Sequence, residues 1–172
     1  MEIVLAIATL LGGVTAVWFF WDKAREFTLG TSKVNTHDLE LFEQYKGMFV
    51  TTGVAEFYRQ HDFLAQFSED YWRPLSSYVD NWYKPDFEFS NSKLQKQHKT
   101  LYEAAEKLGI AIAGNTVTIA PTYKMRSVRP DNLAFGPIPD HIKEEAKEIN
   151  GLVPAFIKAH DDFVKLGNRE LY

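Results

Sequence analysis

The chain has 172 residues, of which 15% are aromatic and none is cysteine, and its formal net charge is −4. This acidic balance argues against general nucleic-acid binding, which would require a basic face. The lack of cysteine agrees with a reducing compartment, and the chain is long enough for one domain with its own core.

The N-terminal residues 3–21 contain no charged side chain. A helix over this stretch would be about 29 Å long, close to the thickness of a bilayer's hydrocarbon core. The stretch ends in tryptophan and phenylalanine residues, which are typical of a membrane–water boundary. We therefore predict a transmembrane helix over residues 1–22 rather than a buried core helix or a cleaved signal peptide.

The basic residues Lys23 and Arg25 follow this predicted span. Because basic residues favour the cytoplasmic side, we expect a single-pass membrane protein with its N-terminus outside. Residues 23–35 would form a juxtamembrane linker. Small residues at helical spacing in the span predict self-association and a homo-oligomer within the lipid bilayer. These residues are Ala6, Thr9, Gly13 and Ala16.

Residues 36–172 are predicted to form a cytoplasmic helical bundle, which makes the expected fold class all-α. Apolar residues at helical spacing indicate helices over residues 36–46, 54–60, 69–82, 92–113 and 140–166. Thr36 and Ser92 are the predicted caps of two of them, with Gln95 completing a capping box. Four prolines predict irregular chain between residues 120 and 139.

Residues 110–119 fit two different structures. Alternating apolar and polar residues around Gly114 and Asn115 are compatible with a small β-hairpin at 110–119. Alternatively, the preceding helix continues through Gly109 and stops near Gly114.

Several short motifs resemble a set of short bacterial membrane-anchored helical proteins. The motifs are HDF at 61–63, WYKP at 82–85 and AHDDFV at 159–164, and the likeness extends from about residue 41 to the C-terminus. This resemblance implies a helical domain, carries over no activity, and favours the continuous helix at 92–113. In its overall organisation alone, a single span followed by a cytoplasmic domain, the chain is similar to single-span antiphage effectors of the Hailong type. Those effectors are channels gated by a nucleotide signal.

Histidine–aspartate pairs raise the alternative of a metal phosphohydrolase of the HD type. Neutral imidazole and carboxylate groups would have to converge to hold the metal. The candidate ligands are His37, His61, Asp62 and Asp161. His98 and His160 lie instead on apolar helix faces, where we expect a buried histidine pair that would be pH-sensitive if the two rings faced each other.

A cationic segment at residues 123–129 has no acidic residue. Because arginine and lysine bind phosphate oxygens, it is a candidate site for an anionic small ligand such as a nucleotide signal. The candidate residues are Tyr123, Lys124, Arg126 and Arg129. The alternative is a solvated loop whose charges pair with acidic residues.

Three functions are compatible with these features. The first is a self-associating membrane effector or channel that is controlled by a ligand or partner. Its similar organisation to the antiphage effectors implies a role in antiphage defence. The second is the membrane-anchored metal phosphohydrolase, and the third is an inert anchor that recruits a partner protein. We expect the first, without enzymatic activity and without a cofactor.

Overall fold

The computed structural model describes residues 35–121, 124–133 and 135–172, all within the unit Val34–Tyr172 of the chain. The predicted span, with Ala6, Thr9, Gly13 and Ala16, and Tyr123 of the cationic segment lie outside these residues. The described part is mostly helical and includes a small three-stranded sheet. The prediction of a helical domain is therefore confirmed, whereas the three-stranded sheet differs from the possible β-hairpin at 110–119.

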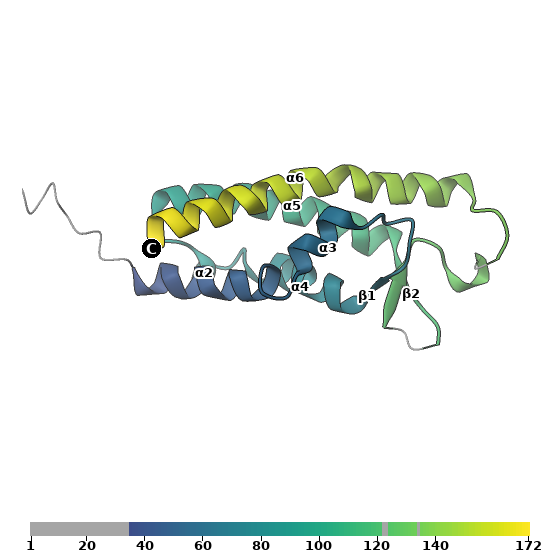
Figure 1. Cartoon of the computed structure of the whole chain (residues 1–172), viewed down its shortest axis with the longest axis horizontal. Coiled ribbons are helices and arrows are strands. Elements are labelled where there is room, and N and C mark those ends of the chain that lie inside the picture. Colours follow the sequence, from purple (N-terminus) through teal and green to yellow (C-terminus); the bar gives the residue numbers. More distant parts are fainter. Residues whose placement is uncertain (1–34, 122–123, 134) are drawn as a thin grey trace, which may run out of the picture. The chain divides into compact units, whose positions relative to one another are not determined.

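The elements of the described residues follow one another in a simple order (Figure 1). They are α2 (Thr36–Phe49), α3 (Val54–Gln60), β1 (Phe67–Ser68), α4 (Glu69–Asn81), η1 (Pro85–Phe87), α5 (Ser92–Asn115), β2 (Val117–Ile119), β3 (Met125–Ser127), η2 (Asp131–Leu133) and α6 (Asp140–Leu171).

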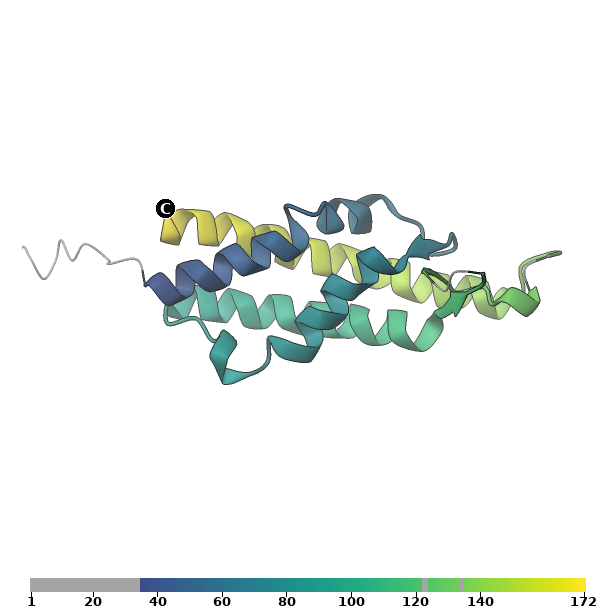
Figure 2. The ribbon, with the colours of Figure 1, turned by 90° about the horizontal axis from the view of Figure 1, so that it is seen from below.

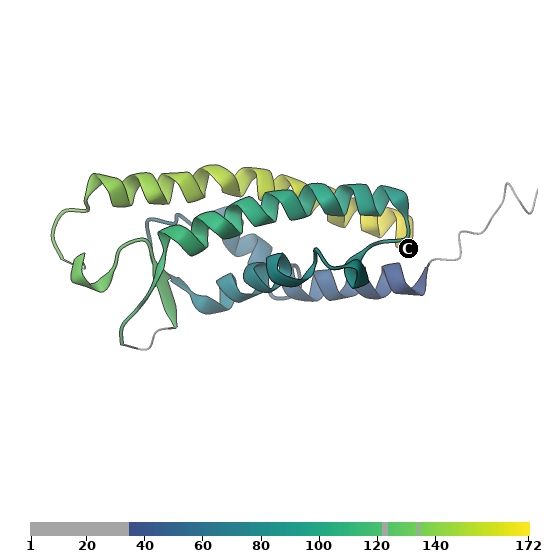
Figure 3. The ribbon, with the colours of Figure 1, turned by 180° about the vertical axis from the view of Figure 1, so that it is seen from behind.

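The two longest of these helices, α5 and α6, run antiparallel and pack against each other along most of their lengths (Figure 3). The shorter helices α2, α3 and α4 pack against one side of this pair, as Figure 2 shows from below. The buried faces of all five meet in one core that is rich in aromatic rings. Its largest fully buried side chains include Tyr45, Tyr58, Tyr78, Phe42, Phe49 and Phe163.

Helix α6 confirms the predicted apolar face but is longer than predicted. Every residue of that face is buried, from Ile142 to Phe163. The predicted helix ends at residue 166, just before Gly167, but the helix continues to Leu171. Gly167 is itself buried, and a Cβ there would overlap the ring of Phe42 on α2. Its role is therefore close helix packing rather than helix termination.

Helix α5 is continuous through residue 115, so the possible hairpin at 110–119 is wrong. Leu108 and Ile112 are both buried and four residues apart, so the helical face persists across Gly109. A Cβ at Gly109 would lie only 3.3 Å from Val79 of α4, so this glycine permits a close helix approach. Residues 117–119 do form a strand, but their partner is residues 125–127.

Both predicted caps are displaced by one residue. Asn35 rather than Thr36 caps α2, and Asn91 rather than Ser92 caps α5. The side chain of Gln95 accepts a hydrogen bond from Phe89 N at 2.8 Å, so no capping box with Ser92 forms. The backbone before α5 is held by Asp38 of α2, a buried carboxylate whose oxygens accept hydrogen bonds from Ser90 N and Asn91 N. Asp38 thereby joins the start of α2 to the start of α5.

The antiparallel sheet has the order β1-β3-β2. The central strand β3 lies in the region where irregular chain was predicted, so that prediction is wrong for residues 125–127. Arg126 pairs in register with Phe67 on one side and Thr118 on the other. The middle of the cationic segment is thus a strand fixed between two others.

Candidate functional site

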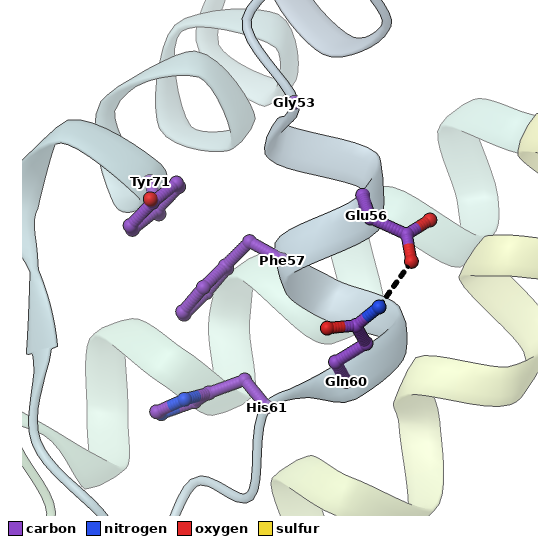
Figure 4. Close-up of a pocket in the computed structure, with 6 residues that line it drawn as sticks. All are labelled: Gly53, Glu56, Phe57, Gln60, His61 and Tyr71. Carbon is purple, nitrogen blue, oxygen red and sulfur yellow. Dashed lines mark hydrogen bonds between the residues drawn. The ribbon is translucent and has the colours of Figure 1, made fainter.

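A pocket of about 470 Å³ opens between α3 and the first turn of α4 (Figure 4). Its main feature is a stack of three partly exposed rings. The centroid of the Phe57 ring lies 4.0 Å from that of the Tyr71 ring, with an angle of 5° between the ring planes. It lies 4.5 Å from the centroid of the His61 ring, with an interplanar angle of 26°. The other residues that line the pocket are Gly53, Glu56 and Gln60.

Helix α3 and its C-terminal cap bring two of these rings together, and the packing of α4 against α3 adds the third. Phe57 and His61 are four residues apart, which puts them on one face of α3 and its C-terminal cap. Gly53 begins α3 with a positive φ of 72°, a conformation that glycine adopts without steric cost. The hydroxyl of Tyr58 donates a hydrogen bond of 3.2 Å to the carbonyl of Tyr71, which ties α4 to α3 beside the stack.

The groups around the stack suit binding of a ring or an apolar side chain. Burial lowers the pKa of His61, which favours a neutral imidazole at pH 7. The carboxylate of Glu56 is bonded by Gln60 and by Arg59, and Arg59 also pairs with Asp161. The exposed surface of the pocket is therefore aromatic edges with one satisfied carboxylate, a set that does not favour an anionic ligand.

The sequence signalled this pocket only in part. The sequence predicts helices over 54–60 and 69–82, which contain Phe57 and Tyr71, and it suggests His61 only as a metal ligand. The spacing of Phe57 and His61 was sufficient to pair them, but Tyr71 belongs to another helix. Its place in the stack depends on tertiary packing.

The residues of the metal hypothesis do not converge. His37 Nε2 lies 3.2 Å from Glu88 O, and His61 Nε2 lies 3.3 Å from Ala65 O. The carboxylate of Asp62 accepts hydrogen bonds from Leu64 N and Asn150, whereas that of Asp161 pairs with Arg59. Across the described residues, no three His, Cys, Asp or Glu side chains are grouped so as to hold a metal ion. The HD-type alternative therefore has no support from this geometry.

Both arginines of the cationic segment are hydrogen-bonded within the fold. The Arg126 guanidinium pairs with Glu69 at 3.0 Å, with both side chains 13% exposed, and also donates to Thr116 O and Thr116 Oγ1. It lies over the ring of Trp72 as well. These contacts use the donors of Arg126 within the fold, and anion binding by the segment stays a prediction.

Arg129 is used in the same way, although its partners are backbone groups. It donates one hydrogen bond to Leu133 O and another, of 2.8 Å, to Gly136 O. Lys124 is exposed, and its carbonyl accepts a hydrogen bond from Glu69 N. The segment therefore shapes the adjoining loops.

The two histidines predicted to be buried are both buried, but they have different surroundings. His160 Nδ1 is hydrogen-bonded to the Tyr45 hydroxyl at 2.5 Å. His98 lies among the rings of Tyr78, Trp82 and Phe89, and its Nε2 has no hydrogen-bond partner in the described structure. No contact between the rings of His98 and His160 is found in this part of the chain.

The helices of the described residues do not include one that is both long and apolar enough to cross a membrane. No protein-family model, curated protein or solved structure matches the chain. The resemblance to short membrane-anchored helical proteins therefore stays a prediction from the sequence motifs.

Proposed function

We propose that this is a single-span protein of the bacterial inner membrane that self-associates and acts as a membrane effector or channel under the control of a ligand or partner. The observation that carries this proposal is the uncharged stretch at residues 3–21, whose length suits a bilayer. Lys23 and Arg25 support a cytoplasmic position for the helical domain. The similar overall organisation of single-span antiphage effectors supports a role in antiphage defence.

Small residues in the span support self-association as the functional step. One helix cannot enclose a pore, so conduction requires several copies with their backbones in close approach. Gly13 allows that approach and Thr9 offers a hydroxyl on the same face. The helical domain would bind the ligand or partner that controls the effector. Its aromatic pocket is better suited to this binding than the cationic segment, because both arginines of that segment are already bonded.

The proposal predicts that Gly13→Leu abolishes function. Leucine would add four heavy atoms where neighbouring backbones come closest, and would loosen or re-register the assembly. The measurement is growth and membrane potential of bacteria that express the full chain. We expect wild type and Leu11→Ile, which lies opposite the small-residue face of the predicted helix, to depolarise the membrane, and Gly13→Leu to be harmless at equal expression. If all three chains have the same effect, the span is only a membrane anchor and the effector proposal is wrong.

A further inference from the structure

The ring stack between α3 and α4 offers ring edges to a bound molecule. Tyr71 and His61 lie on opposite sides of the Phe57 ring, at centroid distances of 4.0 Å and 4.5 Å (Figure 4). Both faces of Phe57 are therefore covered, and only its edge can contact a ligand. A ring edge carries the positive end of the aromatic quadrupole, so it favours the π face of another ring and disfavours a cation.

Gln60 leaves one hydrogen-bond acceptor at the rim of this pocket. Its side-chain amide is bonded to the carboxylate of Glu56, one helical turn earlier. Because a carboxylate only accepts, the amide nitrogen must be the bonded atom, and Oε1 has no partner among the described residues. In Figure 4 this oxygen lies on the side of the amide that is turned toward the rings of Phe57 and His61. Gln60 is exposed, so a ligand can reach the acceptor.

His61 provides a second acceptor beside the ring edges. Its Nε2 lies 3.3 Å from the carbonyl oxygen of Ala65, and since a carbonyl only accepts, Nε2 carries the proton. Burial lowers the pKa of His61, so the ring is neutral at pH 7 and Nδ1 is unprotonated. Glu56 adds a carboxylate to the lining. These polar groups accept hydrogen bonds and disfavour an anion.

The pocket has the size of a site for a small molecule. Its volume of about 470 Å³ lies within the range of roughly 300–1,000 Å³ that is usual for ligand pockets. An anionic ligand would be opposed by the Glu56 carboxylate, and a cationic one by the ring edges. An uncharged flat ring avoids both penalties, and an N–H group on it matches the acceptor of Gln60.

We propose that the pocket between α3 and α4 binds a small uncharged nitrogen heterocycle, which lies across the ring edges and donates an N–H hydrogen bond to Gln60 Oε1. Binding itself does not depend on the proposed function. The proposal rests on that function only in making such a molecule the ligand that controls the effector.

Two probes that differ in one hydrogen-bond donor test this site. Indole is an uncharged ring with an N–H donor, and N-methylindole has the same ring without the donor. Binding is measured on the full chain in detergent by nuclear magnetic resonance of isotope-labelled histidine, as the shift of the His61 ring during titration with each probe. The variant His61→Gln identifies this signal among the five histidines.

Gln60→Leu should remove the advantage of the donor. One ordinary hydrogen bond corresponds to about threefold to tenfold in affinity, so the variant should weaken indole binding by this factor and N-methylindole binding much less. Each probe is compared only with itself between wild type and variant, so its partition into detergent cancels. Gln44→Leu, which changes an exposed glutamine on α2, should leave both affinities at their wild-type values.

The site is wrongly assigned if neither probe shifts the His61 signal, or if Gln60→Leu weakens both probes equally. The proposed function fails separately, through Gly13→Leu. A chain that has a span-dependent membrane effect but does not bind indole would overturn the ligand class alone. Indole binding that depends on Gln60, in a chain without any membrane effect, would keep the site and overturn the effector proposal.

Discussion

Gly167→Ala is expected to destabilise the helical domain by about 1–3 kcal/mol, the usual cost of overpacking a core. The added Cβ would overlap the ring of Phe42, which is fully buried and packs edge-on against Phe163 at 5.7 Å. A ring confined in this way cannot move aside as an exposed side chain would. This cost should outweigh the gain of up to about 1 kcal/mol that alanine brings to a helix interior.

Gly151→Ala is the matched control on the same helix. Nothing lies within 4 Å of the Cβ that it would add, so only the helix-propensity gain remains and the variant should be slightly more stable than wild type. Thermal unfolding of the full chain in detergent, followed by circular dichroism, compares the three proteins. If Gly167→Ala unfolds at or above the wild-type temperature, then α2 and α6 are not as close as described.

Acid should destabilise the domain strongly between about pH 6.5 and pH 4. Burial lowers the pKa of His98 to about 4 and that of His160 to about 4, from an ordinary value of 6.5. The unfolded chain therefore binds more protons than the folded chain in this window, and stability falls as the pH falls. Each shift corresponds to roughly 3 kcal/mol. Together they are comparable with the 5–15 kcal/mol that is typical of whole domains.

His98→Phe separates this effect from general acid denaturation. The His98 ring lies among aromatic rings with Nε2 unbonded, so a phenyl ring should be tolerated at pH 7 and should remove about half of the acid loss. His141→Gln changes an exposed histidine and should leave the pH profile as in wild type. Unfolding temperatures measured from pH 7.5 to pH 4 check both variants, and an unchanged slope in His98→Phe would contradict the assignment.

The sequence predicted helices well where one face of the chain is continuously apolar. The buried faces of α5 and α6 repeat every three or four residues over many turns, so their helical period is unambiguous. Local glycine signals were misleading for the same helices. Gly109 and Gly167 are packing positions against Val79 and Phe42, and that role depends on neighbours distant in sequence.

The candidate site could be predicted much less well, because its residues meet only through tertiary structure. Arg126 is bonded to Glu69, which is 57 residues earlier in the chain, so this ion pair could not be predicted from the cationic segment itself. The stack of Tyr71 on Phe57 likewise joins two helices. None of these contacts leaves a periodic signal in the sequence.

The oligomeric mass of the full chain in detergent tests the central claim most directly. A membrane effector whose spans enclose a pathway requires several copies, so native mass spectrometry of the purified protein should show a defined oligomer of at least about four chains. Gly13→Leu should shift that population to smaller species, and Leu11→Ile should not. A wild-type protein that is monomeric at micromolar concentration would contradict the account.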